Sequence, residues 1–273
     1  MIPAADWLTA RLTRRPPPEL GVFMPAGFPS PFADTEALHA FARRGAGILA
    51  IGIPYRDPWL DDPQVIAAHH RALRHDVRIT DALETVRHLA TTTWTSIVLV
   101  SYWAPVLSYG TDAFARDLAA AGAAGAMIVD LAPERAGPWT AAARRTGIHT
   151  PQLVSPNASD AGLVRTCDIA SGWLYIRAAN APTSPHPHEP LDTEAVTQLA
   201  ARLHRVSSLP LVAGLADPEA AAALSYQVSA VVIDTPVVRP LLDGGRHGLE
   251  QAADHVAEFS RVLRPSAARS AAP

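Results

Sequence analysis

Residues 47–63 read GILAIGIPYRDPWLDDP, an apolar run that opens into a polar loop with prolines and three aspartates. The run from Gly47 to Ile53 carries no charge, as expected of a parallel strand that is buried on both faces. The loop after it holds Asp61 and Asp62 side by side. This stretch therefore predicts a buried strand whose carboxyl end leads into a polar site.

The same alternation continues along the whole chain. Short apolar runs occupy residues 21–26, 47–53, 96–102, 125–131, 150–156, 172–178, 209–215 and 229–235. Segments with helical spacing lie between them, among them residues 33–45, 80–90, 111–122 and 192–206. Eight such repeats predict an α/β fold, a single (β/α)8 TIM barrel with parallel strands. A doubly wound open sheet is the alternative, but no GxGxxG motif follows a strand to support it.

Length and composition fit one domain with a large core. The chain has 273 residues, of which 48% are hydrophobic and 18% are charged, and one α/β barrel commonly takes about 250 residues. We expect residues 1–265 to form the barrel domain and residues 266–273 to be a frayed tail.

Charge and targeting features argue against several classes of partner. The net charge of −3 provides no basic surface for nucleic acid or for an anionic membrane. No stretch approaches membrane-spanning length, and the N-terminus lacks a secretory apolar region. The single cysteine, Cys167, cannot form an internal disulfide. We therefore expect a cytoplasmic protein that binds a small molecule and neither nucleic acid nor membrane.

In an α/β barrel the chemistry sits at the carboxyl ends of the strands and in the loops that follow them. The stretches at these positions read PAGFPSP (25–31), IGIPYRDPWLDDP (51–63), SYWAPVLSYGTDAFARDLAAAG (101–122), DLAPERAGPW (130–139), LVSPNAS (153–159) and VAGLADPE (212–219). In these stretches the chain resembles the α subunit of tryptophan synthase. They occur in the family's order and cover almost the whole chain.

The resemblance implies an activity and a partner. Members of this family cleave indole-3-glycerol phosphate by a retro-aldol reaction to indole and glyceraldehyde 3-phosphate. They dock on a pyridoxal-phosphate β subunit, which receives the indole, and carry no cofactor of their own. The reaction uses a Glu at the end of the second strand and an Asp in the loop after it as acid–base groups. Backbone N–H groups after strands 6, 7 and 8 hold the phosphate.

The acid–base positions are only partly kept in this sequence. The family's Glu stands two residues before the Gly that corresponds to Gly52, so its position is occupied by Ala50. The loop carboxylate is present as Asp61, and Tyr175 matches a tyrosine that lines the family's site. We expect Asp61 to be the remaining acid or base, with Tyr175 assisting, and loss of a positioned acid–base group typically costs about 10²–10⁴-fold in rate.

The phosphate loops are also altered. Thr183 and Gly214 match the family, whereas Ser184 replaces a glycine of the loop after strand 6, and Asp234-Thr235 replaces the Gly-Ser pair after strand 8. A carboxylate at 234 would oppose a phosphate dianion and would itself cap the following helix. The same stretches remain the expected substrate-binding positions.

Arg177 leaves two alternatives open. Strand alternation puts it on the same face as Tyr175, so that it points into the barrel mouth. There it could hold a carboxylate of the substrate, or it could pair with Asp234. Asp62 is expected on the surface. We expect no metal at His69-His70 or in the loop at residues 183–190, which is more typical of a remodelled lid.

Three functions follow from these observations. The chain could be a repurposed barrel enzyme for a non-phosphorylated indole or other aromatic substrate in specialised metabolism. Alternatively, it could be a non-catalytic partner of a β-type subunit, or an enzyme that keeps weak indole-3-glycerol phosphate lyase activity for tryptophan biosynthesis. The absence of a carboxylate at Ala50, together with the presence of one at Asp234, favours the first.

Overall fold

A computed structural model describes residues 3–14, 17–177 and 192–264. Its centre is one sheet of eight parallel strands, arranged in the order β4-β3-β2-β1-β8-β7-β6-β5. The strands are β1 (Glu19–Pro25), β2 (Ile48–Gly52), β3 (Ser96–Ser101), β4 (Gly125–Ile128), β5 (Gln152–Val154), β6 (Leu174–Arg177), β7 (Leu211–Gly214) and β8 (Ala230–Ile233). Each lies within or beside one of the eight predicted apolar runs.

The two ends of this sheet meet between β4 and β5. The Ala126 N–H donates to the His149 carbonyl at 3.0 Å, and the His149 N–H donates to the Ala124 carbonyl at the same distance. These bonds join the sheet into a nearly closed barrel, and the predicted TIM barrel is confirmed. The open doubly wound alternative is excluded because the two outer strands of the sheet meet in this way.

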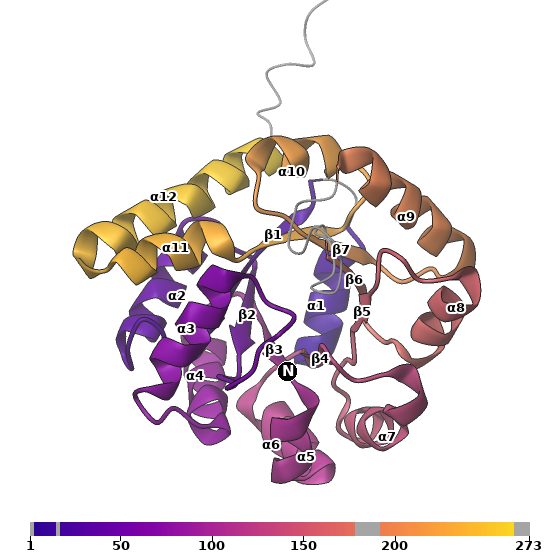
Figure 1. Ribbon diagram of the computed structural model, residues 1–273, viewed down its shortest axis with the longest axis horizontal. Helices are drawn as coiled ribbons and strands as arrows, with labels where there is room; N and C mark the ends of the chain where they lie inside the picture. The colour runs from indigo at the N-terminus through magenta and orange to yellow at the C-terminus, as the bar shows by residue number, and fades with distance from the viewer. Residues whose placement is uncertain (1–2, 15–16, 178–191, 265–273) are drawn as a thin grey trace, which may run out of the picture.

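Helices surround the barrel, as Figure 1 shows. In the described residues they are α1 (Ala4–Leu12), α2 (Ala33–Arg43), α3 (Pro63–Leu73), α4 (Ile79–Thr92), α5 (Trp103–Tyr109), α6 (Thr111–Ala121), α7 (Gly137–Thr146), α8 (Asp160–Ile169), α9 (Thr193–Val206), α10 (Pro218–Leu224), α11 (Thr235–Asp243) and α12 (Gly245–Leu263), with a 3-10 turn at Pro133–Arg135. Helices α2, α4, α6 and α9 correspond to the four helical segments named from the sequence.

Alternation along each strand separates two apolar layers. On β2, Leu49 and Ile51 are fully buried between the sheet and the outer helices, whereas Ile48 and Ala50 line a cavity inside the barrel. The same two-residue period puts Val98 and Val100 of β3 on the inner face. This period explains why the strands are apolar throughout: both faces are covered.

The N-terminal helix α1 contributes to the interior of the barrel. Its Leu8 and Leu12 are buried and line the same cavity as the strands. His149, before β5, joins α1 to the barrel through a 2.9 Å hydrogen bond to the Thr9 hydroxyl. No helix among the described residues is long and apolar enough to cross a membrane. The predicted tail at 266–273 lies outside the described residues.

Candidate active site in the barrel

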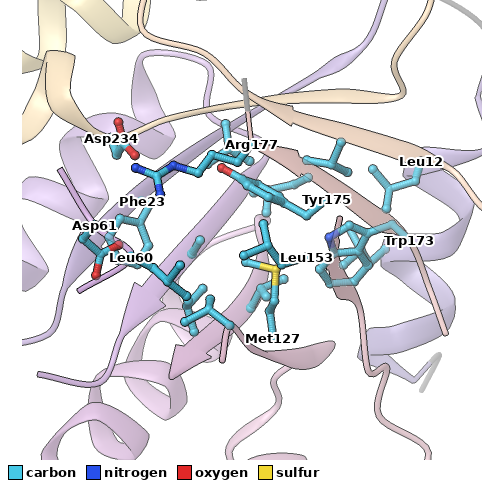
Figure 2. A pocket seen from close by; sticks show the side chains of 18 of the residues that line it. Leu12, Phe23, Leu60, Asp61, Met127, Leu153, Trp173, Tyr175, Arg177 and Asp234 are labelled. Atoms are coloured by element: carbon cyan, nitrogen blue, oxygen red, sulfur yellow. The ribbon is translucent and has the colours of Figure 1, made fainter. Parts of the chain in front are cut away.

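The candidate site is a cavity of about 100 Å³ inside the barrel. Apolar side chains form most of its wall, and polar side chains gather at one part of it, as Figure 2 shows. The wall consists of Leu8, Leu12, Phe23, Ile48, Ala50, Leu60, Val98, Val100, Met127, Val129, Leu153, Trp173, Val212 and Val232. The polar group consists of Asp61, Asp62, Tyr175, Arg177 and Asp234. Such a mixture suits an aromatic or other apolar ligand that carries a few polar groups.

Ala50 lies in the apolar part of the wall. It is 7% exposed and stands in register with Phe23 of β1 and Val98 of β3. Strand β2 therefore presents a methyl group to the cavity where the family resemblance implies a carboxylate. No proton can be given or taken at this position.

Asp61 lies in the loop between β2 and α3, at the cavity wall. The Tyr102 hydroxyl donates to Asp61 Oδ2 at 3.1 Å and accepts the Leu60 N–H at 3.0 Å. Burial and the Asp61 carboxylate raise the pKa of Tyr102, so its phenol stays protonated at neutral pH. Tyr102 therefore holds the Asp61 segment against the end of β3.

Arg177 at the end of β6 pairs with Asp62. Its Nη2 lies 3.0 Å from Asp62 Oδ1, because the guanidinium reaches across the mouth toward the β2–α3 loop (Figure 2). The sequence leaves open an ion pair between Arg177 and Asp234. Among the described residues Arg177 pairs with Asp62 and makes no ion pair with Asp234. The prediction that Asp62 lies on the surface is wrong: its side chain is 27% exposed and lines the cavity.

Tyr175 points into the cavity from the middle of β6 (Figure 2). Burial raises the pKa of its phenol, and the Asp234 carboxylate raises it further. Gly214, in register with Arg177 on the neighbouring strand, does not line the cavity. A Cβ at 214 would lie 3.0 Å from Cζ of Tyr175, so the glycine makes room for the tyrosine ring.

Asp234 caps α11, as the sequence predicts. Its carboxylate accepts the Thr235 N–H, and its carbonyl accepts the N–H groups of Val237 at 3.0 Å and Val238 at 2.9 Å. Burial raises its pKa to about 6; the bond from Thr235 counteracts this, and the charges of Asp62 and Asp61 add to it. The N-terminus of α11 is thus already occupied by an anion of the protein itself.

The remaining predicted positions contribute less to this cavity. Thr235 does not line it, although its hydroxyl is buried and has no hydrogen-bond partner among the described residues. Thr183, Ser184 and the loop at residues 183–190 lie outside the described residues. The described part of the chain contains no cluster of three or more His, Cys, Asp or Glu side chains placed to hold a metal.

Two residues of the site are not among the positions predicted from the sequence. Tyr102 belongs to the YWAPVL motif, which carries the family resemblance but for which the sequence predicts no role. For His69 the sequence raises only the question of a metal site, and none is expected. His69 lies on α3, is 2% exposed, and places Nε2 3.4 Å from Asp61 Oδ2. The sequence offers no signal for this contact, because nothing in it marks which face of α3 turns toward Asp61.

A second hollow adjoins the mouth. It is lined by residues that follow β2, β4 and β5, including Trp59, Asp130, Pro133 and Ser155, and by residues of α8, including Arg165. Asp130 also accepts the Trp103 N–H at 2.6 Å, so it orders the start of α5. Trp59 is 47% exposed.

Sequence comparison identifies the family of the chain. The family model described as "Tryptophan synthase alpha chain" matches residues 10–267. The chain belongs to the tryptophan synthase alpha chain family. It is 33% identical to the tryptophan synthase alpha chain of Mycobacterium avium over 237 residues, 86% of each chain. It is 32% identical to that of Thermobifida fusca over 250 residues, which is 90% of this chain and 92% of the relative.

Solved structures of tryptophan synthase have the same fold. The ligand-free form from M. tuberculosis matches with a TM-score of 0.82 and 30% identity, covering 96% of this chain and 97% of that one. The aminoacrylate-bound form matches with a TM-score of 0.83 and 29% identity, covering 96% and 100%. The tryptophan synthase alpha-chain fold thus accounts for the whole barrel.

Proposed function

We propose that this chain is a divergent tryptophan synthase alpha-chain-like protein that acts on a non-phosphorylated indole or other aromatic molecule. The observation that carries the proposal is the placement of Ala50 and Asp234. Ala50 contributes only a methyl group to the wall, and Asp234 holds a carboxylate at the N-terminus of α11. The two groups expected to transfer a proton and to accept a phosphate are thus both replaced.

Charge at the mouth disfavours an anionic ligand. Asp61, Asp62 and Asp234 line the same cavity, and the described cation among them, Arg177, is engaged with Asp62. A phosphate brought to this region would meet carboxylates in a partly desolvated setting, where like charges repel strongly. Residues 178–191, which lie outside the described part of the chain, include no lysine or arginine in their sequence.

The cavity wall supports an aromatic ligand. Phe23, Met127 and Trp173 offer rings and a thioether to a flat apolar molecule, and contacts of sulfur and rings with aromatic groups are favourable. Asp61 would act as the acid–base group or hydrogen-bond acceptor, and Tyr175 as a neutral donor. We propose that the protein acts in the cytoplasm and requires no cofactor.

Partnership with a β-type subunit is a second candidate function. Trp59, in the loop after β2, is 47% exposed, and Leu107 of α5 is 60% exposed. Both lie in segments that the family resemblance assigns to contact with the β subunit, and the similar solved structures from M. tuberculosis are of tryptophan synthase. In this case the chain would stimulate its partner without turning over a substrate. The third candidate, weak indole-3-glycerol phosphate lyase activity, is supported by the overall similarity to alpha chains.

Calorimetric titration separates these candidates. The purified protein is titrated with indole-3-glycerol phosphate, with indole-3-glycerol, and with a tryptophan synthase β subunit. We expect the non-phosphorylated compound to bind at least about ten times more tightly than the ester, since a factor of ten is only about 1.4 kcal/mol of charge repulsion. Tight binding of the ester would overturn the proposal and favour the lyase, whereas uptake of the β subunit alone would favour the non-catalytic partner.

A further inference from the structure

We infer that His69 is a positioning residue that fixes the Asp61 carboxylate and directs one of its oxygens into the cavity. The inference rests on the proposed function only in treating Asp61 as the carboxylate that meets the ligand. His69 itself is buried on α3 and does not line the cavity, so it acts through Asp61 and not on the ligand.

The tautomer of His69 is set by the backbone. The Tyr55 N–H donates to Nδ1 of His69 at 3.2 Å. A nitrogen that accepts a hydrogen bond carries no proton, so the ring proton of neutral His69 must lie on Nε2. Tyr55 thereby turns His69 into a donor at Nε2, the side of the ring that faces Asp61.

Asp61 is the acidic group that this donor faces. Nε2 lies 3.4 Å from Asp61 Oδ2, but it makes no hydrogen bond to Asp61 or to any other residue that the structure describes. A buried donor that is left unpaired is costly. A small rotation of the Asp61 carboxylate that aligns Oδ2 with the Nε2 proton is therefore favourable.

Both groups that hold Asp61 use the same oxygen. Tyr102 donates to Oδ2 at 3.1 Å, and His69 approaches Oδ2 from α3. No hydrogen bond to Oδ1 is made within the described residues. Oδ1 is thus left as the acceptor for a ligand N–H or O–H group, and its direction is set by two donors on Oδ2.

The support of this arrangement is rigid. Tyr55 and Tyr102 stack with ring centroids 4.9 Å apart and an interplanar angle of 22°, so the residue that sets the tautomer packs on the residue that also holds Asp61. Phe23, which lines the cavity (Figure 2), lies 6.4 Å from the His69 ring. A fixed acceptor oxygen lowers the entropic cost of binding a ligand in one orientation.

Two variants separate the roles of the two ring nitrogens. His69→Asn keeps an acceptor near Nδ1 for the Tyr55 N–H but does not reach Asp61. His69→Gln places an amide N–H near Nε2 and can restore that contact. With indole as the probe, we expect His69→Asn to weaken binding by about 5–20-fold, which corresponds to about 1–2 kcal/mol, the size of a single hydrogen bond. His69→Gln should stay within about 3-fold of the wild type. Equal affinity for all three proteins would overturn the inference.

A second measurement is independent of any ligand. NMR of the His69 ring nitrogens should show a protonated Nε2 and an unprotonated Nδ1 in the wild-type protein, with slow exchange of the Nε2 proton. Asp61→Ala should speed that exchange by about tenfold or more, because the proton loses its acceptor. A protonated Nδ1 in neutral His69, or exchange that does not respond to Asp61, would disprove the positioning role. If indole does not bind the wild type, this measurement still decides the inference, and the proposed function is judged separately by the titration with indole-3-glycerol.

Discussion

Gly214 of β7 leaves open the space that the Tyr175 ring of β6 occupies. A Cβ on Gly214 would lie 3.0 Å from Cζ of Tyr175 and closer still to the hydroxyl oxygen. The ring is directed into the cavity from the neighbouring strand. The glycine that the family resemblance assigns to phosphate binding thus has a second role here, which is to let Tyr175 reach the site.

Gly214→Ala should displace Tyr175 and destabilise the fold by about 1–3 kcal/mol, because overpacking forces a side chain or the backbone to move. Urea unfolding gives the free energy of unfolding of each variant. Gly137→Ala is the matched control, since a Cβ there meets no atom within 4 Å. If Gly214→Ala lowers the free energy of unfolding no more than Gly137→Ala does, the packing of Tyr175 against Gly214 is contradicted.

Asp234→Asn should change how stability depends on pH. The folded pKa of Asp234 is raised to about 6 from an ordinary value of 3.8. The folded state therefore binds more protons between these values, and stability falls as pH rises from about 4 to 6. Asn removes this cost and keeps a capping side chain. The variant should gain about 1–3 kcal/mol relative to wild type between pH 4 and pH 7, measured by urea unfolding at both pH values. A pH-independent difference would disprove the raised pKa.

Ala50→Glu alone should restore little lyase activity. The new carboxylate would enter an apolar wall between Phe23 and Val98, and Asp234 would still oppose the phosphate. In Ala50→Glu we expect the rate of indole release from indole-3-glycerol phosphate to remain about 100-fold or more below that of an ordinary alpha chain. The double variant Ala50→Glu/Asp234→Gly should release indole faster than Ala50→Glu alone. Full activity in the single variant would show that Asp234 does not oppose the ester.

Tyr102→Phe should destabilise the protein by about 1–3 kcal/mol, because the Leu60 N–H loses its acceptor and Asp61 loses a donor. The melting temperature should fall by several degrees. Tyr109→Phe is a matched control: its hydroxyl also bonds a carboxylate, Asp117, at 2.6 Å, but it leaves no backbone N–H without a partner. A larger effect at Tyr109 would contradict the assignment.

The ion pair between Asp62 and Arg177 should show a measurable coupling. A double-mutant cycle with Asp62→Asn and Arg177→Met isolates the pairwise energy, and we expect about 1 kcal/mol for this partly buried pair. The pair of Arg202 and Asp160, whose carboxylate is 78% exposed, is the comparison and should couple more weakly. Equal coupling energies for the two pairs would mean that partial burial at the barrel mouth does not strengthen the ion pair between Asp62 and Arg177.

The eight strands can be predicted because their signal is local. An apolar run such as residues 47–53 needs only its own composition to indicate a strand that is covered on both faces. Strand ends are predicted less well: the run at 125–131 extends past β4, which ends at Ile128. Beyond that residue Val129 lines the cavity and still donates its N–H to the Ser101 carbonyl of β3 at 2.9 Å, although it lies outside the strand.

The polar contacts of the site can be predicted only in part. The family resemblance identifies Asp61 and Tyr175, and both line the cavity. It does not identify the partner of Arg177, because Asp62 lies 115 residues away in the sequence. Tyr102 and His69 escape prediction as supports of Asp61 for a similar reason: each belongs to a different element, and no periodicity within one element shows which side chains of another will meet it.

The sequence by itself determined the barrel, the family and the identity of the residues at the altered positions. Continuous apolar runs, β–α alternation and the order of motifs can all be read along the chain, and the motifs identify Ala50 and Asp234 by position. Only the tertiary structure decided that Arg177 pairs with Asp62. The same is true of the contact between Gly214 and the Tyr175 ring, and of the position of His69 beside Asp61. These contacts join strands and loops that become neighbours when the sheet closes, and their geometry depends on side-chain direction across the barrel mouth.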